Sequence, residues 1–169
     1  MSIDNIPLPV SMYQSLFKKN LVDLKAKPGQ NNSLGKEKSI DFLGGNGKNI
    51  AFILSDPHHK FLNDNELKFL SGLISACDIT MADIAIVNFA HYKDLDYKNV
   101  ISALASKKIL CFGVLATDLN LPFAIPDFQV QLFNEVQYIF CPNFEHLQKN
   151  ISSKKQLWAS LQKIFKINK

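Results

Sequence analysis

Polar side chains suited to acid–base chemistry and hydrogen bonding follow three apolar segments of this 169-residue sequence. They are Ser55, Asp56, His58, His59, Asn88, His91, Cys141 and Asn143. An aspartate, an amide and nearby imidazoles in one crevice can position a water molecule and bind a planar polar ligand. The alternative for Asp56 and Asn143 is structural, because these residue types often cap the turn that follows a strand.

Parallel strands would bring these residues to one edge of a sheet. The run Ile50–Leu54 is apolar throughout and too short for a useful helix, and Pro57 stops it, as expected of a strand buried on both faces. Further strands are predicted at residues 83–89, 108–113 and 136–141, and the carboxyl ends of parallel strands line one crevice. The sequence therefore predicts an α/β fold, a three-layer sandwich around a central, mainly parallel sheet of about four strands.

Capping residues and apolar spacing predict the helices and turns of this fold. Asn63 and Glu66 form a capping-box pattern before a helix that runs to about Cys77. Residues 128–133 alternate apolar residues with glutamine, as an edge strand does, and Asn134–Glu135 is a candidate turn into the last strand. Two further helices are predicted to begin after the caps Asp96 and Ser152 or Ser153.

The first 47 residues differ in composition from the rest of the chain. Residues 1–25 hold one amphipathic segment, in which apolar side chains recur at helical spacing at Met12, Leu16, Phe17 and Leu21. A helix this short is not stable alone, so it must dock on the domain or on another protein. Residues 26–47 are polar and glycine-rich, which is typical of a flexible linker, and the α/β domain is therefore predicted to span 48–169.

The composition predicts a globular, cytoplasmic protein with no membrane partner. Hydrophobic residues make up 47% of the chain and charged residues 20%, and no apolar run approaches the roughly 20 residues of a membrane span. The N-terminus lacks the pattern of a secretory signal. Cys77, Cys111 and Cys141 lie in apolar segments without metal-ligand spacing, which favours buried free thiols. We expect neither a metal nor a cofactor.

The basic residues of the chain are all lysines, 19 in number, and the net charge is +4. Without arginine, bidentate reading of bases and phosphates is not expected, although lysine still attracts phosphates without sequence preference. The C-terminal segment carries six lysines and no acid after His146, at Lys149, Lys154, Lys155, Lys163, Lys166 and Lys169. This is either a solvated helix face or a patch for weak, non-specific contact with DNA or an acidic partner.

Several short motifs between residues 48 and 167 resemble those of the uracil-DNA glycosylase superfamily. ILSDPHH (53–59), IVNF (86–89), FGVLAT (112–117) and FCPNFEHLQKN…KKQLW (140–158) are similar to the motifs of that family. The resemblance implies that Asp56 orients an attacking water and that Asn88 reads the base. The chain departs from the family where Cys141 replaces the catalytic histidine, and the glycine that normally precedes the Asp56 turn is missing.

The layout of the chain, with an arm, a linker and a small α/β body, resembles a non-enzymatic relative of that fold. This relative is the family of psi subunits of the bacterial DNA polymerase III clamp-loader assembly, and PNFEHLQKNISSKKQLWASLQKIF is similar to its C-terminal pattern. The resemblance implies a non-catalytic adaptor whose partners are clamp-loader or other replication proteins. Met12, Leu16, Phe17 and Leu21 would then dock on a partner. A DNA repair enzyme using Asp56 and Asn88, an unrelated α/β function, and an arm packed on its own domain are the alternatives.

Overall fold

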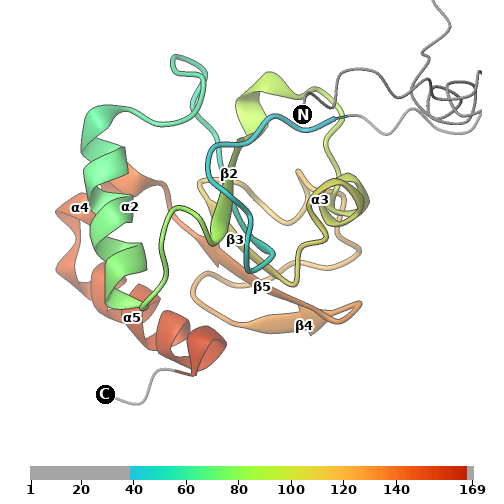
Figure 1. Ribbon diagram of the computed structural model, residues 1–169. Coiled ribbons are helices and arrows are strands. Elements are labelled where there is room, and N and C mark those ends of the chain that lie inside the picture. The colour runs from blue at the N-terminus through green and yellow to red at the C-terminus, as the bar shows by residue number, and fades with distance from the viewer. Residues whose placement is uncertain (1–38, 167–169) are drawn as a thin grey trace, which may run out of the picture. The chain divides into compact units, whose positions relative to one another are not determined.

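A five-stranded sheet runs through residues 39–166, the part of the chain that the computed structural model describes (Figure 1). Its strand order is β2-β1-β3-β5-β4; β2, β1, β3 and β5 are parallel, whereas β4 is antiparallel to β5. The strands are β1 (Ile50–Leu54), β2 (Ile84–Asn88), β3 (Lys108–Phe112), β4 (Gln131–Phe133) and β5 (Val136–Cys141). The predicted α/β class with a mainly parallel sheet is confirmed, and the sheet has five strands instead of about four.

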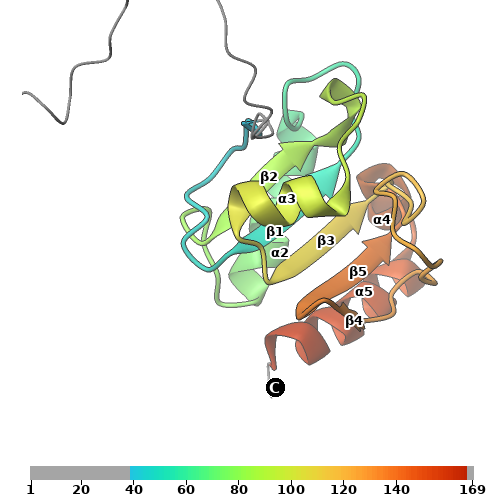
Figure 2. The ribbon, with the colours of Figure 1, turned by 90° about the vertical axis from the view of Figure 1, so that its right-hand side faces the viewer.

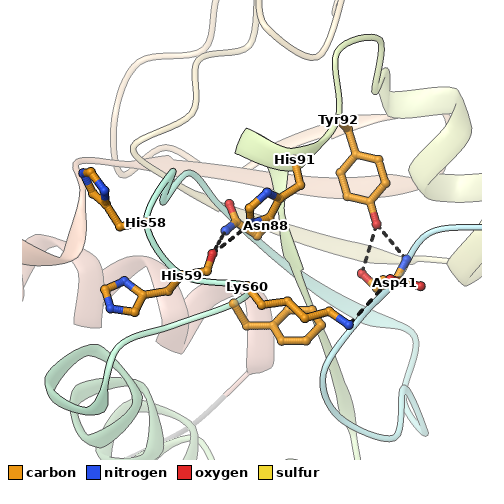
Figure 3. A pocket seen from close by; sticks show the side chains of 8 residues that line it. Asp41, His58, His59, Lys60, Asn88, His91 and Tyr92 are labelled. Atoms are coloured by element: carbon orange, nitrogen blue, oxygen red, sulfur yellow. Dashed lines mark hydrogen bonds and ion pairs between the residues drawn. The ribbon is translucent and has the colours of Figure 1, made fainter.

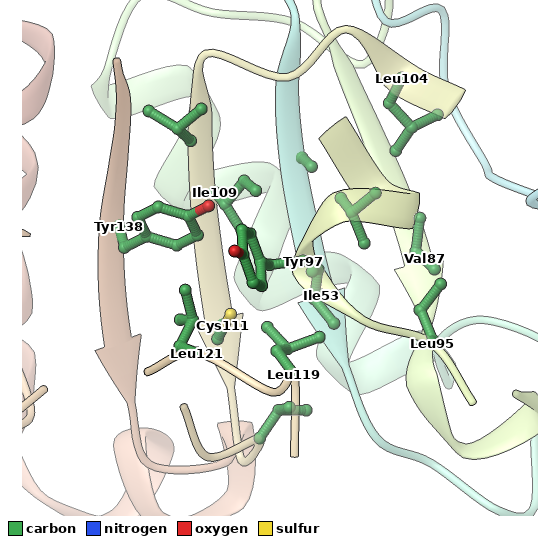
Figure 4. Close-up of a cluster of buried hydrophobic side chains, with 14 of the residues drawn as sticks. Ile53, Val87, Leu95, Tyr97, Leu104, Ile109, Cys111, Leu119, Leu121 and Tyr138 are labelled. Carbon is green, nitrogen blue, oxygen red and sulfur yellow. The ribbon is translucent and has the colours of Figure 1, made fainter. Parts of the chain in front are cut away.

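Helices cover both faces of this sheet, as Figure 2 shows from the side of α3. They are α2 (Asp64–Ala76), the 3₁₀ turn η1 (Phe89–His91), α3 (Tyr97–Leu104), α4 (Phe144–Lys149) and α5 (Ile151–Phe165). Successive side chains of a strand point to opposite faces, so each strand contributes to two cores. On one face Ile53 and its neighbours pack with α3 (Figure 4), and on the other Phe52 and its neighbours pack with α2, α4 and α5.

Several elements coincide with the sequence prediction because local signals fix them. Strand β1 has the predicted bounds and is buried at all five positions. The capping box of α2 is present, with the Asn63 side chain accepting from the Glu66 N–H and the Glu66 carboxylate accepting from the Asn63 N–H. Asn134 and Glu135 both have positive φ, as the turn into β5 requires.

The end of the chain was predicted less well. The predicted caps Ser152 and Ser153 are wrong, because α5 begins at Ile151 after Asn150, whose side chain accepts from the Ser153 N–H at 3.2 Å. Asparagine is a strong N-cap in its own right, and here it also ends the preceding helix α4. The predicted edge strand over 128–133 is shortened to β4, and Phe128 has a φ of 63°, outside the region of regular strands.

Residues 40–47 of the predicted flexible linker pack on the folded body instead, against the backbone of residues 81–86. Ile40 is buried, and the backbone of Leu43 exchanges hydrogen bonds of 2.9 and 2.8 Å with Ile86. Gly44 has a φ of 113°, and a Cβ there would collide with the carbonyl oxygen of Ile84. The glycines of this segment therefore allow close packing of backbone on backbone, which composition alone does not distinguish from flexibility.

The predicted arm, with Met12, Leu16, Phe17 and Leu21, lies outside the described residues, as does most of the predicted linker. Within residues 39–166 every helix is too short or too polar to cross a membrane. The three cysteines are buried and free, as the sequence predicted.

Candidate functional site

The carboxylate of Asp56 organises the turn that follows β1. One of its oxygens, Oδ1, accepts from the backbone N–H groups of His58 at 2.8 Å and His59 at 3.3 Å, and Oδ2 lies 2.7 Å from Nδ1 of the His59 ring. Burial raises the pKa of the Asp56 carboxyl, but the hydrogen bonds from the His58 N–H and from His59 outweigh it and lower the pKa overall. Asp56 is therefore ionised, and its carboxylate caps the turn formed by the residues that follow it.

The side chain of Asn88, at the end of β2, holds the same turn from the neighbouring strand. Its Oδ1 accepts from the N–H of Asp56 at 3.0 Å and from the N–H of Ala90 at 3.1 Å. Its Nδ2 donates to the carbonyl oxygens of Asp56 at 2.6 Å and of His59 at 2.7 Å. An asparagine amide has two donors and one oxygen with two lone pairs, so all of its hydrogen-bonding capacity is used. Asn88 is also only 2% exposed.

A cavity of about 350 Å³ lies beside this turn (Figure 3). The residues that line it are Asp41, His58, His59, Lys60, Phe61, Asn88, His91 and Tyr92. Several of their polar atoms are paired with one another. The Nε2 atom of His91 lies 2.8 Å from the carbonyl oxygen of His59, and the Tyr92 hydroxyl accepts from the N–H of Asp41 at 2.7 Å.

The structure separates the predicted crevice residues into two groups. Asp56, His58 and Asn88 lie together at the carboxyl ends of β1 and β2, and Ser55 beside them is exposed. Of this first group, His58 and Asn88 line the cavity, and neither Cys141 nor Asn143 does. Cys141 is 3% exposed in the core beneath α4 and α5, where burial raises the pKa of its thiol. The Asn143 side chain accepts from the N–H of His146 at 2.9 Å and caps α4.

Four lining residues were missed by the sequence analysis: Asp41, Lys60, Phe61 and Tyr92. Asp41 was assigned to the linker, and its contact with Tyr92 joins positions 51 residues apart. The available signal was sequence position, because Lys60 follows His59 directly and Tyr92 follows His91 directly.

The arrangement places a carboxylate beside an imidazole at the edge of the cavity. A carboxylate at Nδ1 of His59 orients the imidazole and leaves Nε2 as a possible proton acceptor. Among the described residues, however, the cavity has no serine, threonine or cysteine lining it that such a base could activate. The described part of the chain also contains no cluster of three or more His, Cys, Asp or Glu side chains that could hold a metal ion.

Comparison with known proteins adds no further constraint on this site. The chain matches no model of a known protein family, and no curated protein matches it significantly.

Proposed function

We propose that this chain is a non-catalytic adaptor of the DNA replication machinery. In this proposal it resembles the psi subunits of clamp-loader assemblies and is built on a degenerate uracil-DNA glycosylase-like fold. The observation that carries the non-catalytic part is the complete internal use of the Asn88 amide. In the glycosylase alternative Asn88 would face a base, and Asp56 would hold a water.

The hydrogen bonds of this turn weigh against that alternative. If the Asn88 amide turned toward a ligand, it would lose its hydrogen bonds to the backbone N–H and C=O of Asp56 and to the carbonyl oxygen of His59. Each buried polar group left unpaired costs about 1–3 kcal/mol. The position that the catalytic histidine would occupy is held by Cys141, which is buried away from the cavity. Both residues are therefore better accounted for as parts of a structural scaffold.

The partner-binding part of the proposal rests on residues 1–25. Met12, Leu16, Phe17 and Leu21 give this segment an apolar stripe at helical spacing, and a short amphipathic helix gains stability by docking in a groove of a partner. The proposed partners are clamp-loader or other replication proteins.

Affinity purification from extract of the native cell tests this proposal. Full-length protein is compared with Phe17→Ala and with Lys18→Ala, a matched change at the neighbouring position, and bound proteins are identified by mass spectrometry. Clamp-loader subunits retained by the full-length and Lys18→Ala proteins and lost from Phe17→Ala support the adaptor. Absence of replication proteins from all three samples, together with uracil release from single-stranded DNA that Asp56→Ala abolishes, supports the glycosylase instead.

A further inference from the structure

A second hollow, lined by other residues than the cavity beside the Asp56 turn, lies between helices α2 and α5, which Figure 1 shows on the same side of the sheet. Its volume is about 370 Å³, and its lining residues are Lys68, Phe69, Gly72, Leu73, Ala76, Lys154 and Leu157. Phe69, Leu73 and Leu157 form an apolar floor that continues into the core beneath the two helices. We call this hollow the α2–α5 groove.

Gly72 lies in the middle of α2, on the wall of this groove. A Cβ at this position would meet no atom within 4 Å, so neither a tight contact within the chain nor a special backbone angle requires glycine. Glycine in the interior of a helix is less stable than alanine. Ala76 follows four residues later, on the same side of α2. The small side chains of Gly72 and Ala76 leave room for another backbone to approach α2 closely.

The charges around the groove have one sign. Its charged lining residues among residues 39–166 are Lys68 on α2 and Lys154 on α5. Helix α5 contains no acidic residue, and the acids in the first turn of α2, Asp64 and Glu66, do not line the groove. An occupant that places carboxylates on both sides of an apolar stripe would complement this surface.

We propose that the α2–α5 groove docks an amphipathic helix of a partner protein, with apolar residues at helical spacing and acidic residues flanking them. Other occupants fit the groove less well. A second copy of this chain would bring the same lysines against Lys68 and Lys154, and residues 11–25 of this chain carry three lysines and one aspartate. A nucleic-acid backbone would place phosphates on an apolar floor. The proposal does not depend on the partner of residues 1–25.

The experiment uses full-length protein and a displayed library of random 16-residue peptides. Peptides are selected on the wild-type protein in the presence of excess soluble Gly72→Trp, whose indole would fill the groove. The best binders are synthesised, and their affinities are measured by fluorescence anisotropy. The variants are Gly72→Trp, Gly72→Ala and Ser71→Trp, the last of which places the same side chain on the neighbouring exposed position of α2. Circular dichroism and thermal unfolding verify that each variant folds.

The expected binders are amphipathic helices with acidic flanks. Gly72→Trp weakens their binding at least about tenfold, whereas Ser71→Trp leaves it unchanged. The double variant in which Lys68 and Lys154 are both replaced by glutamate also binds these peptides more weakly. Replacing the acidic flanking residues of a peptide by lysines restores its binding to this double variant. Gly72→Ala raises the Tm by a few degrees, because it removes a helix-interior glycine without a clash.

Three outcomes would overturn the proposal. The first is the absence of enriched peptides, or binders that Gly72→Trp and charge reversal do not affect. The second is sedimentation of the wild-type protein as a dimer that Gly72→Trp dissociates, which would make the groove a self-association surface. The third is binding of a DNA oligonucleotide that the same substitution abolishes.

Discussion

Replacement of Asn88 by alanine tests whether this amide is part of the scaffold. The substitution removes four hydrogen bonds, of which the two to the backbone N–H and C=O of Asp56 are fully buried, and the two to His59 and Ala90 are partly buried. A buried polar group left without a partner costs about 1–3 kcal/mol, and a partly buried one costs less because water can replace the lost partner. Asn88→Ala should therefore lower the free energy of unfolding by about 2–5 kcal/mol.

Urea unfolding at pH 7, followed by circular dichroism and by the fluorescence of the single tryptophan Trp158, measures this loss. For a protein of this size the same change corresponds to a Tm lower by about 10 °C. Asn99→Ala is the matched control, because the Asn99 amide donates one exposed hydrogen bond of 3.3 Å to Asp94, and its loss should change stability by less than about 0.5 kcal/mol. An Asn88→Ala protein as stable as this control would refute the reasoning, since an amide that holds nothing is free to bind a ligand.

Three further predictions follow from other buried groups among residues 39–166. The pKa of Asp56 is lower in the folded than in the unfolded chain, so its stabilising contribution is present above about pH 4 and is lost as the pH falls through the folded-state pKa. In unfolding experiments between pH 2.5 and 7, Asp56→Asn should therefore lose less stability in acid than the wild-type protein does. A pH profile of stability equal to that of the wild-type protein would contradict this. Burial raises the pKa of the Cys111 and Cys141 thiols and raises the pKa of Cys77 to about 11. An aromatic disulfide reagent at pH 8 should therefore label the native protein slowly and the guanidinium-unfolded protein at once. Rapid labelling of the native protein would show that these thiols are accessible. The hydroxyl of Tyr138 is buried with no hydrogen-bond partner among residues 39–166, so Tyr138→Phe should be neutral or stabilise the protein by up to about 1 kcal/mol. A free energy of unfolding in urea that falls by more than about 1 kcal/mol would show that the hydroxyl has a partner.

Local signals explain which elements could be predicted from the sequence. The apolar run of β1 and the capping box of α2 are decided within a few residues of chain, and both are present as predicted. Residues 40–47 have the composition of a linker, but their position depends on the backbone of residues 81–86, about 40 residues away. Asn150 competes with Ser152 and Ser153 as a cap, and in the structure it both ends α4 and caps α5.

The candidate site, like the fold, was predictable from the sequence only in part. Asp56 follows β1 by two residues and Asn88 ends the adjacent parallel strand β2, so the expectation of one shared sheet edge brings them together. Cys141 ends β5 and Asn143 follows it. Strand β5 is separated from β1 by β3, and at about 4.8 Å per strand this puts both residues roughly 10 Å from β1. The strand order, which sets this distance, is a property of the whole fold and has no local signal in the sequence.

The most direct test of the adaptor proposal is binding between purified components. Isothermal titration of the full-length protein into the purified clamp-loader assembly of the same organism should show saturable binding, weakened at least about tenfold by Phe17→Ala and unchanged by Lys18→Ala. No heat of binding with any of the three proteins, or equal binding by all three, would contradict the account.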